Sequence, residues 1–239
     1  MSHHAALTIL MTVGGAALLT PATSSAQAYQ CAIPGAVAPI APIKPDSPAR
    51  RAPVAGYTLA ASWSPDYCKT SGDSRSMQCS RQNGRFGFVL HGLWPEARQG
   101  ASPQWCAQGR PPSAAIVRRH LCMTPSPRLL AHEWAKHGTC MTGRAETYFN
   151  VSAILWRSIR WPDADRLSRN KNLTVGDLRS EFLAANPDWR RDQVGVDLSR
   201  SGWLREVRLC YGKDFRPAAC DSRRFGPADS ASLKIWRGL

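Results

Sequence analysis

The sequence predicts an α+β fold that occupies a single domain, residues 55–239. Stretches with the two-residue apolar alternation of strands are separated by stretches with helical spacing, and the strands are expected to pair mainly antiparallel. About 185 residues are enough for one domain with a sizeable core. The eight cysteines predict that disulfides stabilise this domain. Residue patterns alone do not exclude a mixed sheet.

The first 28 residues are predicted to be a secretory signal peptide. Residues 5–19 form an apolar and small-residue run that is too short to span a membrane, and Ala26-Gln27-Ala28 is a small-x-small cleavage site. No later segment approaches about 18 continuous apolar residues, so no membrane span is expected. Together with the even number of cysteines, this predicts a secreted or periplasmic protein, in an oxidising compartment.

Residues 29–54 are predicted to form a proline-rich, extended arm. Six prolines lie between residues 32 and 53, and large apolar residues are few there. The composition becomes globular at Tyr57, and alternation from Tyr57 to Trp63 predicts the first strand of the domain.

Further elements follow from local signals along the chain. Helical spacing predicts a helix within residues 145–160. Thr174 and Asp177 form a capping-box start for a helix that ends before Pro187. Residues 206–211 and 233–237 are expected to be late strands.

One candidate catalytic histidine, His91, lies in residues 88–95 (FVLHGLWP). The alternation from Phe86 to His91 predicts a strand with His91 at its end, on the face opposite Phe86, Phe88 and Leu90. The Gly-Leu-Trp-Pro run that follows is not expected to continue regular pairing. His91 is therefore predicted at an edge or rim of the sheet.

Two further histidines lie in residues 132–140 (HEWAKHGTC). Helix-compatible residues follow Pro127, and the helix is expected to stop at Gly138. Relative to His132, the side chains of Lys136, Glu133 and His137 would lie about 40°, 100° and 140° around the helix axis, so all four share one side.

This set of residues fits acid-base displacement at phosphorus. A neutral imidazole can take a proton from an attacking hydroxyl while a protonated one gives a proton to the leaving oxygen. The ammonium of Lys136 can stabilise charge on the transition state, and Glu133, four residues before His137, is placed to orient that ring or hold it protonated. The scheme requires no metal ion and no cofactor.

The residues also support a resemblance. Residues 91–95 (HGLWP) and 132–140 resemble the two active-site signatures of the ribonuclease T(2) family, and residues 62–68 (SWSPDYC) resemble its N-terminal strand. The match spans roughly residues 57–215 in order and spacing. It implies a secreted, base-nonspecific endoribonuclease that forms a 2',3'-cyclic phosphate and then a 3'-phosphate. It also implies a central antiparallel sheet packed by helices.

The resemblance implies a role for each residue of the two signatures. His91 and His137 would be the proton-transfer pair. Glu133 and Lys136 would flank the scissile phosphate, and His132 would contribute to phosphate binding.

Three other residues, Trp94, Glu96 and His120, are interpreted separately. Trp94 resembles the aromatic residue that stacks on a base, although packing alone would also explain it. The family often has Asp where this chain has Glu96, so base preference stays open. His120 lies outside both signatures and is interpreted as a structural histidine.

The pairing of the cysteines cannot be derived from their spacing. The resemblance implies three pairs and would leave Cys31 and Cys122 for each other. Cys140 would then tie the end of the helix that bears His137 to the loop after the first signature. The three implied pairs are Cys68 with Cys79, Cys106 with Cys140, and Cys210 with Cys220.

The predicted reaction is transphosphorylation of single-stranded RNA. His91 is the favoured base for the ribose 2'-hydroxyl and His137 the favoured acid for the leaving 5'-oxygen, although the sequence leaves the two roles open. DNA lacks the internal nucleophile and should not be cleaved. The excess of 31 Lys and Arg over 17 Asp and Glu, a net charge of +14, suits a polyanionic substrate. A monomer is expected.

Two other classes of function each have one sequence feature in their favour. A zinc hydrolase would use His-Glu-x-x-His, with ligands four residues apart, whereas His132 and His137 are five apart and Lys136 would repel a cation. A noncatalytic protein that binds RNA or an acidic envelope polymer would explain the charge. It would not explain a complete acid-base set.

Overall fold

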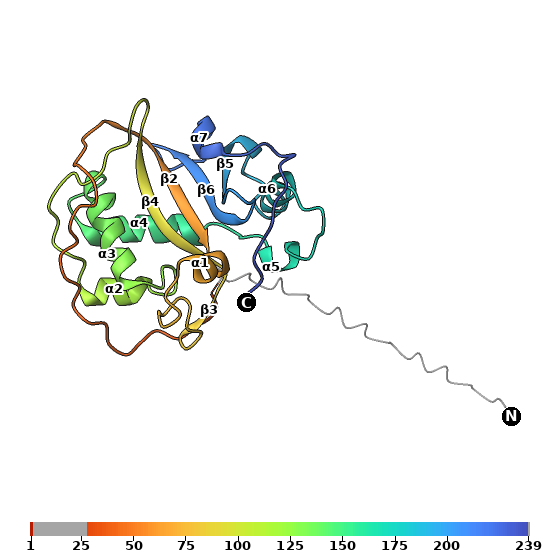
Figure 1. The fold of residues 1–239 in the computed structure, drawn as a ribbon, viewed down its shortest axis with the longest axis horizontal. Helices are drawn as coiled ribbons and strands as arrows, with labels where there is room; N and C mark the ends of the chain where they lie inside the picture. The colour runs from red at the N-terminus through yellow and green to blue at the C-terminus, as the bar shows by residue number, and fades with distance from the viewer. Residues whose placement is uncertain (2–27, 239) are drawn as a thin grey trace.

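The computed structural model describes Met1 and residues 28–238 (Figure 1). The predicted signal peptide, residues 1–28, therefore lies outside the described residues except at its two ends. The strands are β1 (Ala28–Cys31), β2 (Val54–Trp63), β3 (Gly84–Phe86), β4 (Phe88–Ala97), β5 (Val194–Leu198) and β6 (Leu204–Gly212). The helices are α1 (Ser64–Thr70), α2 (Ala114–His120), α3 (Pro127–Lys136), α4 (Ala145–Arg157), α5 (Ala164–Leu167), α6 (Val175–Ala185) and α7 (Ser222–Phe225), with 3-10 turns η1 (Gly138–Cys140) and η2 (Arg191–Gln193).

Four strands form the central sheet in the order β4-β2-β6-β5, and β1 pairs with β3 in a separate small sheet. All of these pairings are antiparallel. The predicted α+β fold with a mainly antiparallel sheet packed by helices is therefore confirmed. A mixed sheet is not found among the described strands.

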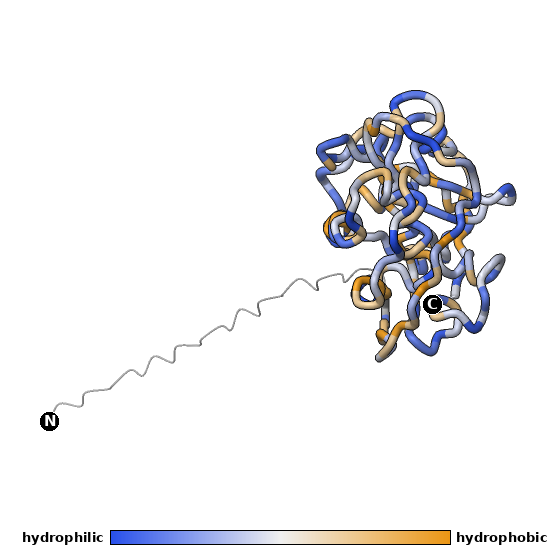
Figure 2. Tube along the Cα trace, turned by 90° about the vertical axis from the view of Figure 1, so that its left-hand side faces the viewer, coloured by the Kyte–Doolittle hydropathy of each residue, from blue (hydrophilic) through white to orange (hydrophobic). Residues whose placement is uncertain are grey.

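The helices cover the sheet from two flanks. In Figure 1, α2, α3 and α4 lie on the side of β4, with α4 passing behind the strands, whereas α5 and α6 lie near β5 and β6. Leu59 and Trp63 of β2 share one buried cluster with Tyr148 and Phe149 of α4. Figure 2 shows hydrophilic segments concentrated along the outer loops. The rigid core therefore fixes β4 and the helices beside it, which bear the candidate site.

Several predicted elements have the expected positions. The strand that begins near Tyr57 is β2, and the helix within residues 145–160 is α4. Helix α6 begins with the predicted capping box, in which Thr174 accepts a hydrogen bond from the backbone of Asp177 and the Asp177 side chain accepts one from the backbone of Thr174. The late strand at residues 206–211 is β6.

The strand predicted at residues 233–237 is not present. This segment forms only single bridges, Trp203 to Lys234 and Thr174 to Ser232. Lys234 exchanges backbone hydrogen bonds with Gly202 and Leu204 at the start of β6, but from Glu206 onward β6 is paired with β2 on one edge and β5 on the other, so this contact does not extend along β6. Its apolar alternation instead reflects the burial of Leu233 and Ile235 in the core.

The proline-rich arm contains no helix or strand between residues 32 and 53, apart from a bridge between Arg50 and Gln104. Figure 1 shows it running along the outside of α2 and α3 before it enters β2. The arm therefore lies beside α3, the helix that carries the first residues of the second signature.

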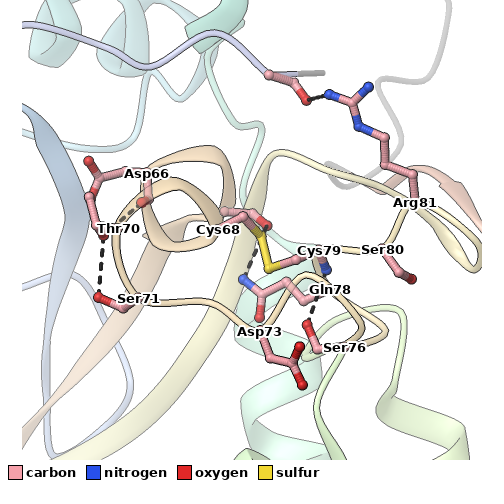
Figure 3. Close-up of a disulfide and its surroundings, with 12 residues drawn as sticks. Asp66, Cys68, Thr70, Ser71, Asp73, Ser76, Gln78, Cys79, Ser80 and Arg81 are labelled. Atoms are coloured by element: carbon pink, nitrogen blue, oxygen red, sulfur yellow. Dashed lines mark hydrogen bonds between the residues drawn. A yellow bond between two sulfur atoms is a disulfide. The ribbon is translucent and has the colours of Figure 1, made fainter.

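Four disulfides join the cysteine pairs that the resemblance implies. Cys31–Cys122 ties the start of the arm to the segment after α2. Cys106–Cys140 ties η1 to the loop after β4, in which Gln104 pairs with Arg50 of the arm. Cys68–Cys79 closes the loop after α1, where Arg81 donates a hydrogen bond to the carbonyl oxygen of Gly238 (Figure 3). The fourth pair is Cys210–Cys220.

Candidate active site

His91 lies in the middle of β4, not at a strand end as predicted. The strand continues through Trp94, Pro95 and Glu96, which pair with Thr58, Tyr57 and Gly56 of β2. Proline is tolerated because β4 is an edge strand of the sheet. The prediction of a sheet edge is therefore confirmed, whereas the prediction that pairing stops after His91 is wrong.

A β-bulge sets the position of the His91 side chain. Ala61 pairs with Leu90 and Ala60 pairs with Gly92, so His91 has no partner residue on β2. Such a bulge redirects a side chain and breaks the alternation of faces that simple strand geometry predicts. Sequence alternation alone could not give this register.

The His91 ring is held by a buried carboxylate on the neighbouring part of the sheet. Nδ1 of His91 lies 2.8 Å from Oε1 of Glu206 on β6 and donates a hydrogen bond to it. Arg208 donates to the other oxygen of Glu206 at 2.9 Å, and Ser62 donates to Oε1 at 3.3 Å. The bond to Nδ1 leaves Nε2 of His91 directed toward Glu133, whose Oε1 is 3.7 Å away.

These carboxylates favour the charged form of His91. Burial opposes that form, but the hydrogen bond that His91 donates to Glu206 and the negative charges of Glu133 and Glu206 raise the pKa of His91 to about 9. Glu206 keeps a lowered pKa despite its burial, because it is bonded to His91 and lies next to the Arg208 guanidinium. At neutral pH this geometry gives a protonated His91 beside an ionised Glu206.

Sequence reasoning missed Glu206. Glu206 begins the strand predicted at residues 206–211, and Arg208 follows two residues later. Because side chains alternate along a strand, these two charged residues share one face of a strand that is otherwise apolar. A charge pair at the start of a buried strand was the available signal. Only the pairing of Ser62 with Glu206 brings that face next to His91.

Helix α3 presents the second signature. Ser126 caps its start by accepting a hydrogen bond from the backbone of Leu129, and Pro127 occupies the first turn. The helix ends at Lys136, short of the predicted stop at Gly138, and His137 is its C-terminal cap residue. His132, Glu133 and Lys136 therefore lie on the helix, and His137 lies just beyond it.

Glu133 is only 3% exposed and points toward β4. Its Oε2 accepts a hydrogen bond of 2.7 Å from the indole of Trp94. This approach depends on Gly92, because a Cβ atom there would overlap Oε2 of Glu133. Burial raises the pKa of Glu133 to about 7, although the charge of His91 and the Trp94 bond act in the opposite direction. The Glu133 side chain does not bond to the His137 ring as predicted, because it is bonded to Trp94 and lies beside His91.

The His137 ring is half-buried, and its Nδ1 has no hydrogen-bond partner among the described residues. Burial and the positive charges of Lys136, His132 and His91 lower the pKa of His137 to about 3. His137 is therefore neutral under conditions in which His91 is charged.

Trp94 brings the two histidines together. Its ring centroid lies 5.1 Å from that of His91 and 5.6 Å from that of His137. Imidazoles from β4 and from the end of α3 thus contact one indole, whose nitrogen is fixed by Glu133. The structure therefore brings together four of the predicted site residues, namely His91, Trp94, Glu133 and His137.

The remaining two predicted residues, His132 and Lys136, lie one turn apart on α3, where both face Asp46 of the proline-rich arm. Both carboxylate oxygens of Asp46, from the proline-rich arm, accept hydrogen bonds from Nζ of Lys136 at 3.1 and 3.0 Å. Nε2 of His132 lies 3.8 Å from Oδ2 of Asp46. Burial and the nearby Lys136 lower the pKa of His132, and Asp46 partly offsets this effect. Sequence reasoning did not place Asp46 near the site.

Two cavities adjoin these residues. One of about 360 Å³ opens beside His91 and His132, and its lining includes Tyr67 and Gln78. A second, of about 280 Å³, is lined by Trp94. The other residues that line the second cavity include Glu96, Ser102, Arg208, Arg223 and Arg224.

The described residues contain no group of three or more His, Cys, Asp or Glu side chains arranged to hold a metal ion. In the same residues, no helix combines the length and apolar character needed to cross a membrane. His120 is buried and its ring stacks on Phe149 with centroids 5.4 Å apart, outside the candidate site.

Known proteins resemble this chain in sequence and in fold. The family model described as Ribonuclease T2 family matches residues 55–164. A ribonuclease of Aeromonas hydrophila is 42% identical over 166 residues, which cover 66% of this chain and 72% of that protein. A probable ribonuclease of Haemophilus influenzae is 30% identical over 186 residues, 72% of this chain but only 63% of that protein. The solved structure of trichomaglin, described as a novel S-like ribonuclease, has a similar fold, with a TM-score of 0.61 and 21% identity over 76% of this chain and 98% of trichomaglin. On the sequence relationships and the fold together, this chain belongs to the ribonuclease T2 family.

Proposed function

We propose that this protein is a secreted endoribonuclease that cleaves single-stranded RNA by transphosphorylation. It forms a 2',3'-cyclic phosphate and then a 3'-phosphate end, without a metal ion or cofactor. The observation that supports this most strongly is the contact of two imidazoles of opposite protonation state, His91 and His137, with the same indole of Trp94.

The electrostatics favour proton-transfer roles opposite to those preferred from the sequence. His137, with a lowered pKa, is the base that takes the proton from the ribose 2'-hydroxyl. The 2'-oxygen then bonds to phosphorus, the bond from phosphorus to the 5'-oxygen breaks, and that oxygen receives a proton from charged His91. In the second step water attacks the cyclic phosphate and the two histidines exchange roles. DNA, which has no 2'-hydroxyl, is not a substrate.

The other residues of the site hold the reacting phosphate. Lys136 supplies positive charge for its non-bridging oxygens, and a ring N–H of His132 can donate a hydrogen bond to them. Glu133, whose raised pKa gives it a protonated fraction near neutrality, can donate a hydrogen bond to one of them. Glu206 acts through His91 and is a positioning residue: it orients the ring and keeps it charged.

A base of the substrate stacks on Trp94 in the 280 Å³ cavity. Glu96 is an acceptor in this cavity, where its carboxylate already accepts hydrogen bonds from Thr58 and Ser102. The arginines of the same cavity suit the phosphates of a longer RNA chain. We propose that the protein acts as a monomer outside the cytoplasm, in a compartment that maintains its four disulfides.

The proposal is tested by incubating purified protein with single-stranded RNA and excess EDTA. Cyclic-phosphate ends should appear first and 3'-phosphate ends later, whereas the matching DNA stays intact. His91→Ala and His137→Ala should each lower the rate by about 10² to 10⁴, the range of general acid-base catalysis, with an unchanged thermal unfolding midpoint. Full activity in either folded variant would refute the assigned roles. RNA that is bound but never cut by the wild type would favour the noncatalytic alternative.

A further inference from the structure

The proline-rich arm places a carboxylate against two hydrogen-bond donors of α3, Lys136 and His132. Asp46 contacts Lys136 through both of its oxygens and lies near His132 through one of them. Its negative charge also acts on His137, where it favours the protonated form. Asp46 thus interacts with the residues to which the proposed function assigns a phosphate.

The arm holds Asp46 in this place through the residue that follows it. Ser47 donates a hydrogen bond of 2.7 Å to Oδ1 of Asp46 and accepts hydrogen bonds from Gln104 and Trp105. Just beyond, the backbones of Arg50 and Gln104 exchange two hydrogen bonds of 2.9 Å. The bonds from Ser47 and Lys136 lower the pKa of Asp46 to about 2, so the carboxylate is charged at any physiological pH.

On the N-terminal side of Asp46 the arm borders two cavities. Residues 37–44 border a cavity of about 540 Å³, and residues 42–45 border another of about 660 Å³ that reaches α3. The arm is fastened at its start by Cys31–Cys122 and at its end by the Arg50 pairing. Since the Asp46 side chain is about half exposed, at 49%, it can rotate or lift away while both fastenings stay in place.

We propose that Asp46 is an intramolecular competitor of the substrate phosphate. Its carboxylate occupies the position of two phosphate oxygens at Lys136 and His132, and RNA must displace it in order to bind. The inference rests on the proposed function for the identity of the substrate. The physical reason is that a carboxylate and a phosphate are anions that accept hydrogen bonds from the same donors, so both cannot occupy one set of donors.

The test is titration of the full mature chain with inorganic phosphate, followed by calorimetry, for wild type and Asp46→Asn. The amide keeps the shape of the carboxylate and removes its charge. Phosphate should bind the variant about two- to fivefold more tightly at low ionic strength, which is the size expected for exposed ion pairs, and the difference should shrink as salt is added. With a short RNA, KM should fall by a similar factor while kcat stays unchanged.

Asp214→Asn is the matched control. Asp214 is an exposed carboxylate whose side-chain partner is Arg216, so the variant has the same change in net charge. It should bind phosphate like the wild type. Asp46→Ser also removes the carboxylate but leaves a shorter neutral side chain. It must show the same gain in phosphate affinity even if Asp46→Asn folds poorly.

The opposite result would overturn the inference. Equal or weaker phosphate binding by Asp46→Asn and Asp46→Ser would mean that Asp46 supports Lys136 and does not compete with the ligand. Phosphate binding requires no turnover, so this outcome is separate from a failure of the proposed function. That failure would appear as RNA left intact by folded wild type and folded variants alike.

Discussion

Nδ1 of His91 and Oε1 of Glu206 lie 2.8 Å apart, on strands β4 and β6 that are separated by β2. The charge of this buried carboxylate is balanced on its other side by Arg208 at 2.9 Å. The pair therefore resembles the arrangement by which a carboxylate fixes the tautomer and orientation of a catalytic imidazole.

Replacement of Glu206 by Gln should move the basic limb of the pH profile. Charged His91 is the proposed acid, so kcat/KM should fall as pH rises through its pKa of about 9. Without the carboxylate, that limb should move toward 6.5, the ordinary value for histidine. The measurement is kcat/KM for RNA from about pH 5 to about pH 10, a range that contains the basic limb expected for each protein. Glu146→Gln, at an exposed carboxylate paired with Arg119 and Arg144, should leave the limb in place. An unmoved limb in Glu206→Gln would mean that Glu206 is only structural.

Gly92→Ala should disable the site through Glu133. The added methyl group would overlap Oε2 of Glu133 and lie 2.7 Å from the indole nitrogen of Trp94, so the bond between them must break. We expect loss of about 2 kcal/mol of unfolding free energy, typical of overpacking, and a fall in kcat of about tenfold or more. Gly143→Ala is the control, because a Cβ atom at Gly143 meets nothing within 4 Å. Urea unfolding and kcat are measured for both. Normal activity in Gly92→Ala would show that the Glu133–Trp94 contact is dispensable.

Removal of the Cys106–Cys140 disulfide should affect catalysis beyond its effect on stability. Cys140 follows His137 by three residues, and the neighbour of Cys106, Trp105, donates a backbone hydrogen bond of 2.7 Å to the carbonyl of Lys136. The double Ser variant should lose about 2 to 4 kcal/mol of stability and also show a lower kcat well below its unfolding temperature. The matching variant of Cys210–Cys220 should lose stability with little change in kcat. Equal effects on kcat would assign both bridges a purely stabilising role.

His120 should make the fold sensitive to acid. Burial, with the nearby charges of Arg119 and Arg157, lowers the pKa of His120 to about 4 in the folded protein, against 6.5 as its ordinary value. Its neutral burial therefore contributes stability that is fully present above pH 6.5 and is lost as pH falls through about 4. The free energy of unfolding, measured by urea at a series of pH values, should fall less steeply over this window in His120→Leu. An identical slope in the variant would show that His120 is not part of the acid response.

The sequence by itself determined the fold class, the two histidine signatures and most of the residues of the candidate site. It could do so because local signals need no knowledge of distant contacts. The capping box at Thr174 and the helix after Pro127 depend on neighbours within one turn.

Only the tertiary structure decided how these residues work together. The bulge at His91 depends on the register between β2 and β4, and the segment at residues 233–237 forms no strand because β6, beyond its first residues, is already paired with β2 and β5. The protonation states of His91 and His137, on which the proposed roles depend, follow from burial and from Glu206, 115 residues away along the chain from His91. Asp46 meets Lys136 across 90 residues. Charge interactions depend on distances in space, and the spacing of residues in a sequence does not contain those distances.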